Sequence, residues 1–265
     1  MISARSIENF ILINTSMFCM SILQCFMLEN NNDFINVFTT FITRNIIFLV
    51  TLYTILYDRP FVSNQDRDKQ NYSNLYIVFY LCSSTAIESL THIYLYNNYQ
   101  FDESKIYDDI LWFIPLSFLY EIIFDFFHYW AHRLEHFGIL YKYVHKLHHK
   151  YKYTLIQFTH CHHPIDLILS NAIPHIVTMF LIPKVSFLTY NMIVMYKVYV
   201  EISGHSGKKI NASSFPQCIW LPRLFNIELC VDCHDEHHIY NTRNYAKRFS
   251  LWDKVFGTFK LQNKN

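Results

Sequence analysis

The sequence predicts an all-α integral membrane protein with four transmembrane helices, a short re-entrant helical hairpin and a cytosolic helical cap. Apolar runs recur along the chain, whose 265 residues are 52% hydrophobic and only 16% charged, whereas about 25% of an ordinary soluble domain is charged. The fifteen histidines repeat one short spacing in segments that lie far apart. The net charge of +1 gives no indication of a nucleic-acid partner.

Four apolar runs have about the length that is needed to cross a hydrocarbon core of about 30 Å. They cover residues 10–28, 34–57, 75–96 and 110–130. The first run lacks the basic region and cleavage site of a signal peptide, so we expect a retained anchor. Two shorter stretches on either side of Pro183, residues 165–182 and 185–200, are expected to form the re-entrant hairpin.

The charges of the connecting loops orient these helices. Residues 58–74 carry three basic side chains, whereas residues 97–109 carry one lysine among four acids. Because basic loops favour the cytosol, we expect the N-terminus and everything after residue 130 to face the cytosol. We divide the chain into an N-terminal transmembrane anchor, residues 1–109, and a histidine-bearing domain, residues 110–265.

Three clusters of histidine distinguish the second domain. His128 and His132 are four residues apart, and the segments "HKLHH" (145–149) and "HDEHH" (234–238) share the pattern His-x-x-His-His. Positions i, i+3 and i+4 lie on one face of an α-helix, so we expect each cluster to aim its imidazoles in one direction. Eight imidazoles are too many for one tetrahedral ion and suit two. Imidazole binds Fe, Zn, Cu and Ni, and redox chemistry at an apolar interface favours iron.

Charged residues beside the clusters are candidates for orienting these ligands. A ligating histidine normally donates its second ring N–H to a carboxylate or carbonyl. Asp125 lies three residues before His128, whereas Asp232 and Asp235 flank the last cluster. We expect these acids to orient ligand rings, although Asp235 could simply be solvated. We expect Arg133, which follows the first cluster, to hold a carboxylate.

The three motifs "HYWAHR", "HKLHH" and "HDEHH", after four apolar runs, resemble the fatty acid hydroxylase/sterol desaturase superfamily of integral-membrane di-iron enzymes. The stretch "NYAKRFSLWDKVFGTF" is similar to the family's Asn-Tyr, Trp-Asp and Phe-Gly-Thr elements, with Ala246 where glycine is usual. "HCHHPID" resembles the His-Pro-x-acid element of the sterol 4-methyl oxidase branch, with Asp166 where glutamate is more usual. "EISGHSG" resembles an isolated His-Ser-Gly element. The resemblance covers residues 110–260, roughly.

The resemblance implies a set of metal ligands, a reaction and partners. The implied ligands are His128, His132, His145, His148, His149, His163, His205, His234, His237 and His238. It also implies two iron ions, O₂, and cytochrome b5 or a similar carrier of electrons from NAD(P)H, at the endoplasmic reticulum. The expected reaction is hydroxylation or desaturation of a membrane lipid. A sterol is favoured, by C4-methyl oxidation or side-chain hydroxylation, with a fatty-acyl or sphingolipid hydroxylase and a sterol C5 desaturase as alternatives.

The other histidines receive different interpretations. His136 lies four residues after His132, but the family has no ligand at this place, so we interpret His136 as structural. His163 precedes Pro164 and could cap the next helix instead of binding metal. We expect the remaining four beside the ligands or in the core: His92, His160, His162 and His175.

Other classes of protein also fit parts of the sequence. "CVDCH" (230–234) matches a haem-attachment pattern, but that attachment occurs on the non-cytosolic side. "HRLEH" (132–136) matches a zinc peptidase pattern with Glu135 as base, which leaves the later clusters unexplained. A non-redox membrane scaffold that binds structural zinc is the third alternative. Zinc often outcompetes iron for such ligands, so zinc in purified material would not decide between these functions.

Overall fold

Helices form the regular structure of this protein. The structure, a computed structural model, describes residues 4–29, 31–63, 73–150, 152–210 and 214–260. Within these residues, extended chain pairs only at an isolated bridge between Phe61 and Lys208. The all-α class predicted from the sequence is confirmed.

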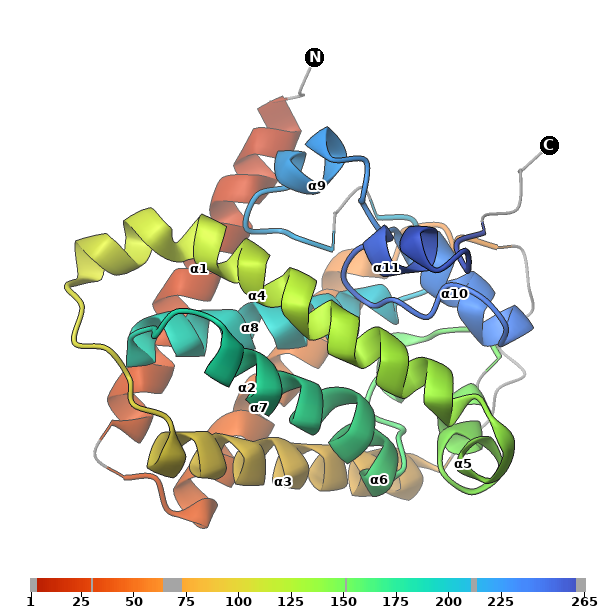
Figure 1. Cartoon of the computed structure of the whole chain (residues 1–265), viewed down its shortest axis with the longest axis horizontal. Coiled ribbons are helices and arrows are strands. Elements are labelled where there is room, and N and C mark those ends of the chain that lie inside the picture. Colours follow the sequence, from red (N-terminus) through yellow and green to blue (C-terminus); the bar gives the residue numbers. More distant parts are fainter. Residues whose placement is uncertain (1–3, 30, 64–72, 151, 211–213, 261–265) are drawn as a thin grey trace.

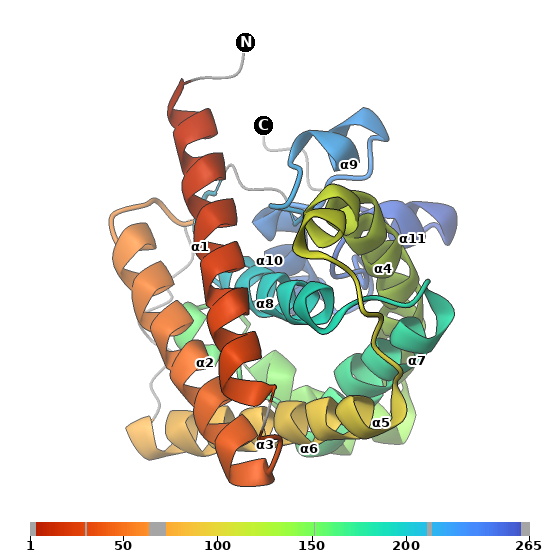
Figure 2. The same cartoon turned by 90° about the vertical axis from the view of Figure 1, so that its left-hand side faces the viewer.

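Five long helices form the body of the molecule. They are α1 (Ala4–Leu28), α2 (Phe34–Leu56), α3 (Asn74–Asn98), α4 (Ile106–Glu135) and α8 (Phe187–Gly204). α2 packs against α3, and α1 packs against α8. Figure 1 shows α4 crossing the molecule obliquely above α3. In Figure 2, α8 lies at the centre, with α1 and α2 on one side, α3 below, and α4 and α7 on the other side.

Shorter elements connect these helices and form the C-terminal part. They are α5 (Gly138–Tyr143), η1 (His145–Lys150), η2 (Ile156–Phe158), α6 (Pro164–Leu167), η3 (Ile168–Ala172), α7 (Ile173–Leu181), α9 (Trp220–Leu224), α10 (Val231–Tyr240) and α11 (Leu251–Val255). α6, η3 and α7 follow one another without a break, and η3 is a π-helical turn just before Pro174. Pro174 has no backbone N–H to donate, so the wider turn lets the helix continue through it. α10 and α11 lie beside the C-terminal half of α4 (Figure 1).

Four helical segments are long and apolar enough to cross a membrane, which is the number predicted. They are Ile7–Leu28, Phe34–Leu56, Ile106–Glu135 and Pro164–Leu181. One of the four segments differs from the prediction. α3, which was expected as the third span, is not among the four, and Pro164–Leu181 takes its place. α3 carries Glu88 and buries the polar side chains of Ser84, Ser89 and His92, which lowers its hydropathy. Pro183 lies between α7 and α8, as expected for a hairpin.

The chain that follows α10 is fastened to the middle of α4. Asp125 accepts hydrogen bonds from the backbone N–H groups of Lys247 (2.7 Å), Arg248 (3.0 Å) and Phe249 (3.0 Å). Nε of Arg248 lies 3.0 Å from a carboxylate oxygen of Glu121, and both side chains are buried. These contacts bring α10, with its three histidines, beside the C-terminal end of α4.

Candidate metal centre

Two groups of imidazoles converge where the C-terminal end of α4, η1, the end of α8 and α10 meet. In each group, one ring nitrogen per residue lies within 4.8 Å of all the others. Group A consists of His132, His136, His145, His149 and His237. Group B consists of His148, His205, His234 and His238. Histidines from three segments that are remote in sequence therefore meet, as the sequence predicts.

Each His-x-x-His-His motif contributes to both groups. His145 and His149 belong to group A, whereas His148 between them belongs to group B. In α10 the assignment is reversed, because His234 and His238 belong to group B and His237 to group A. Consecutive residues point about 100° apart around an α-helix such as α10 and about 120° apart around a 3₁₀-helix such as η1. One short helix can therefore face two neighbouring sites, which corrects the expectation that each motif aims all three rings one way.

The spacing of the nitrogens in group A fits ligands of a single ion. Nε2 of His145 lies 3.1 Å from Nε2 of His132, 3.1 Å from that of His136 and 3.0 Å from that of His149. Nε2 of His136 is 3.1 Å from Nε2 of His237. With metal–nitrogen bonds of about 2.1 Å, neighbouring ligands lie about 3.0 Å apart in an octahedral site and about 3.4 Å apart in a tetrahedral site. The donor set and its spacing therefore fit a metal ion.

Group B has the same character. Nε2 of His234 lies 3.0 Å from Nε2 of His205 and 3.2 Å from Nε2 of His238. The ring of His148 packs on His238, with ring centroids 4.4 Å apart, and stacks on His162 at 4.0 Å. The rings of His148 and His149 are 5.3 Å apart, so the two groups lie next to each other.

The Nδ1 atoms of three of these rings face backbone carbonyls outside the groups. Nδ1 of His132 donates to the carbonyl of Tyr245 (2.8 Å) and Nδ1 of His237 donates to that of Arg243 (2.7 Å). In group B, Nδ1 of His205 donates to the Glu201 carbonyl (2.8 Å). A ring that gives its Nδ1 proton to a carbonyl keeps the Nε2 lone pair free. The second ring nitrogen is thus oriented in the way that metal-binding histidines require.

Burial keeps six histidines of the two groups neutral. Burial, followed by the neighbouring imidazoles, lowers the pKa of His148, His149, His234 and His238 well below the ordinary value. Burial also lowers the pKa of His205 to about 4 and that of His237 to about 3. Neutral imidazole is the form that binds metal, so near pH 7 these groups need not lose protons before binding an ion.

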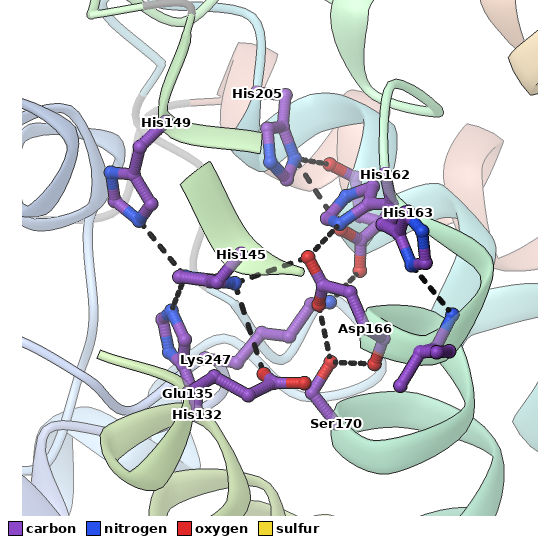
Figure 3. A network of polar contacts seen from close by, with 12 residues as sticks. His132, Glu135, His145, His149, His162, His163, Asp166, Ser170, His205 and Lys247 are labelled. Carbon is purple, nitrogen blue, oxygen red and sulfur yellow. Dashed lines mark hydrogen bonds and ion pairs between the residues drawn. The ribbon is translucent and has the colours of Figure 1, made fainter. Parts of the chain in front are cut away.

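Two histidines expected as ligands lie outside both groups. His128 is buried beside His132, with ring centroids 5.1 Å apart, and its Nδ1 donates to the Ser170 carbonyl at 2.6 Å. His163 is the N-cap residue of α6, and its Nδ1 accepts the backbone N–H of Ile165 at 3.2 Å (Figure 3). The capping role, the alternative left open by the sequence, is therefore the one that the structure shows for His163.

The charged residues expected to orient ligand rings mostly contact backbone groups or hydroxyls instead. Asp125 binds the backbone of the segment after α10, as described above. Asp235 accepts hydrogen bonds from the backbone N–H (3.2 Å) and hydroxyl (3.0 Å) of Thr154 and from the hydroxyl of Ser63 (3.2 Å). Nη1 of Arg133 donates to the hydroxyl of Tyr129 at 2.9 Å, a phenol rather than the expected carboxylate. Asp232 lies in the first turn of α10.

Other acids contact the histidines in their place. Oδ2 of Asp166 lies 3.1 Å from Nδ1 of His145 and 3.4 Å from Nδ1 of His162, and so connects group A to the ring stacked on His148 (Figure 3). Oε2 of the buried Glu135 is 3.8 Å from Nδ1 of His145. Oε1 of Glu201 is 3.4 Å from Nδ1 of His205. The family resemblance drew attention to Asp166, but neither Glu135 nor Glu201 was recognised as a neighbour of the ligands.

A cavity extends from group B into the helical body. It lies between α2, α3, the α6–α7 segment and α8. His162 and Glu201 line one end, and together with His205 they form a further close group of potential ligand atoms. A molecule in this cavity would therefore lie against His162 and Glu201, the neighbours of group B.

Comparison with known proteins matches the sequence to one family. The family model described as fatty acid hydroxylase matches residues 117–258, more than half of the chain. The chain belongs to the fatty acid hydroxylase family. The matched region contains both histidine groups, α8 and most of the cavity wall.

Curated relatives within this family include enzymes of sterol metabolism. A C-4 methylsterol oxidase of Schizosaccharomyces pombe is 32% identical over 157 residues, which are 56% of this chain and 47% of the relative. The lathosterol oxidase of Rattus norvegicus is 31% identical over 167 residues, 59% of this chain and 51% of the relative. A fatty acid hydroxylase of Lecanicillium is 32% identical over 154 residues, 56% of this chain and 42% of the relative. The chain spans about half the length of the curated relatives it matches. No solved structure matches it.

Proposed function

We propose that the chain is an O₂-dependent oxidoreductase that hydroxylates or desaturates a membrane lipid at two metal ions, one in each histidine group. The observation that carries this proposal is the convergence of two adjacent sets of imidazoles, at ligand spacing, beside a cavity. Membership of the fatty acid hydroxylase family supports it. Helices able to cross a membrane support a lipid as the substrate.

The proposed ligands are the nine histidines of groups A and B, without His128 and His163. Five imidazoles in group A exceed the four ligands of a structural zinc site, which favours iron and disfavours the zinc scaffold. Two iron ions, when bound, would supply the activation of O₂ for attack on an unactivated C–H bond. Their electrons would come from an outside donor such as cytochrome b5, because the sequence contains no Gly-x-Gly-x-x-Gly motif for a nucleotide or flavin.

The protein's own residues hold this centre in place and shape the reaction space. The carbonyls of Tyr245, Arg243 and Glu201 fix three ligand rings through Nδ1. Asp166 fixes His145 and thereby helps to position the ring at the middle of group A. The cavity would exclude water and present one C–H bond of the lipid to the face formed by group B and Glu201.

We propose a sterol as the lipid, since relatives include a C-4 methylsterol oxidase, lathosterol oxidases and sterol desaturases. C4-methyl oxidation, side-chain hydroxylation and C5 desaturation are the candidate reactions, and a fatty-acyl or sphingolipid substrate is the alternative. We further propose the endoplasmic reticulum as the membrane, with the histidine groups near its cytosolic face.

Lipid analysis of a sterol-auxotrophic host tests this function. The host expresses either the natural chain or His148→Ala, and sterols and fatty acids are compared by mass spectrometry at matched protein levels. The natural chain should produce at least one lipid that has gained oxygen or lost two hydrogens, and His148→Ala should produce none. If all lipids are unchanged with the natural chain, or if His148→Ala gives the same product, the proposal is wrong.

A further inference from the structure

The cavity beside group B contains an ammonium group for which the proposed chemistry has no use. Lys197, on α8, lines the cavity. Its Nζ donates a hydrogen bond to the side-chain oxygen of Asn171 and lies 5.1 Å from the centre of the Phe124 ring. In the part of the chain that the structure describes, no carboxylate forms an ion pair with Lys197.

The other charged groups of the cavity wall already have partners of opposite charge. A carboxylate oxygen of Glu88 lies 2.6 Å from Nη2 of Arg44, which is almost fully buried. The carboxylate of Glu201 is paired with Nζ of Lys247. Burial lowers the pKa of Lys197 to about 7. When this amine is protonated, the cavity wall formed by the described residues carries one excess positive charge, on Lys197.

Lys197 lies on the same face of α8 as Glu201, which contacts group B. Tyr190, Val194, Lys197 and Glu201 all line the cavity, and their spacing of three to four residues places them along one face of α8. Lys197 and Glu201 are four residues apart, about 6 Å along the helix axis at 1.5 Å per residue. Glu201 in turn contacts His205 of group B. The ammonium thus lies about one turn from the proposed reaction face.

A purely apolar group in this part of the cavity would be unfavourable. It would displace water from an amine whose one hydrogen-bonding partner among the described residues is a neutral amide, and burying the protonated amine without an acceptor or an anion costs more than apolar contact returns. An oxygen atom of the ligand would instead accept a second hydrogen bond from the ammonium, and hydrogen bonds to charged groups are the stronger ones.

We propose that Lys197, held by Asn171, binds an oxygen atom at the polar end of the lipid, either a hydroxyl or a carboxylate. The lipid then lies with its polar end inward, beside group B, and its tail toward the mouth of the cavity. This inference rests on the proposed function for the identity of the cavity's ligand as a lipid. It follows that oxidation takes place within a few carbons of the polar group. For a sterol, the oxidised carbon would then lie in the ring system near the hydroxyl, and oxidation at the far end of the side chain is excluded.

Binding of fluorescent lipids to the full chain in lipid nanodiscs tests the proposal without any turnover. Energy transfer from the protein's tryptophans reports the binding of dehydroergosterol, which has a free hydroxyl, and of cis-parinaric acid, which has a free carboxylate. The 3-O-methyl ether of the sterol and the methyl ester of the acid are the capped counterparts. We expect the natural chain to bind at least one free probe about tenfold more tightly than its capped form.

Two substitutions identify the residue responsible. Lys197→Met keeps the aliphatic stem, and it should remove the preference for the free probe while leaving the affinity for the capped probe unchanged. Lys184→Met is the matched control, because Lys184 is exposed and its Nζ donates to Gln100; it should change neither affinity. A preference for the sterol alone identifies a hydroxyl ligand, and a preference for the acid alone identifies a carboxylate.

Equal binding of free and capped probes by the natural chain would overturn the proposal, and this comparison needs no variant that might misfold. Equal preferences in the natural chain and a folded Lys197→Met would overturn it too. Because binding is measured without oxidation, loss of the preference and loss of the proposed enzymatic function are separate results. If the chain also oxidises a sterol, a product modified at the end of the side chain contradicts the inward orientation while leaving the oxidase function intact.

Discussion

The exchange of His163 for His136 in the proposed ligand set gives a direct test of the geometry. The two variants are His136→Ala and His163→Ala. His136 lies in group A, with its Nε2 3.1 Å from the Nε2 atoms of His145 and His237. His163 caps α6 through the N–H of Ile165. The sequence alone favours the opposite assignment for both residues.

The two substitutions should change different quantities, metal affinity for His136→Ala and folding stability for His163→Ala. Substitutions that only disturb the orientation of a ligand lower metal affinity by about 10- to 100-fold, so removal of the ligand His136 should weaken one of the two sites by at least about 100-fold, about 2.8 kcal/mol. His163→Ala removes an N-cap hydrogen bond, which costs about 1 kcal/mol of stability. It should leave both metal affinities unchanged.

Anaerobic titration of the metal-free chain with buffered Fe(II), followed by elemental analysis, measures both affinities. Thermal unfolding of the same samples measures the stability change. At an iron concentration that saturates both sites of the natural chain, His163→Ala should retain two ions and His136→Ala should retain about one. A chain that keeps both ions without His136, or loses one without His163, refutes the assignment of ligands from the structure.

Three further outcomes follow from the structure. Asp125→Ala should lower the free energy of unfolding by more than about 2 kcal/mol, because three buried N–H groups lose their acceptor; a loss within 0.5 kcal/mol, roughly the range of ordinary surface changes, is the contrary result. Removing bound metal with a chelator should lower the melting temperature, while the helical circular dichroism signal measured at about 20 °C is retained. An unchanged melting temperature argues against metal-dependent stability. Burial lowers the pKa of His160 from 6.5 to about 4, so the unfolded chain binds the extra proton between these values and stability falls as pH drops from 6.5 toward 4, by about 1.4 kcal/mol per pH unit. His160→Gln should remove that one-proton contribution, and an unchanged pH dependence of unfolding contradicts it.

Much of the fold was predictable because composition constrains it strongly. Apolar runs of membrane length predict helices whatever segments flank them. α2 begins and ends within one residue of the predicted boundaries, whereas α1 and α4 extend beyond the predicted runs by four to six residues at one or both ends. α3 was expected as a membrane span but is not among the four segments apolar enough to cross a membrane, since its apolar character is interrupted by polar residues that pack inside the molecule, such as Ser89 and His92. The continuity of Pro164–Leu181 depends on a π-helical turn before Pro174, for which hydropathy gives no signal.

The histidine site was predictable as a region but not as a ligand set. The spacing of the boxes indicates that imidazoles lie near one another, yet it does not tell which of the two histidine groups each ring joins. The group that a ring joins depends on where α10 lies relative to η1. The position of α10 depends in turn on long-range contacts, such as those of Asp125 with the backbone of residues 247–249. His136 has the i+4 relation to His132 that could have identified it, but the family pattern was given more weight. Nothing in the sequence separates His163 as a cap from His163 as a ligand.

The measurement that tests the central claim most directly is a single turnover with ¹⁸O₂. The chain is loaded anaerobically with iron, reduced with dithionite in nanodiscs made from total membrane lipid, and then exposed to the labelled gas before lipid extraction and mass spectrometry. The account predicts one class of lipid that carries ¹⁸O or has lost two hydrogens, absent from both His145→Ala and His234→Ala, because each disrupts one histidine group. Lipids that remain unchanged in a chain that holds two iron ions would contradict it.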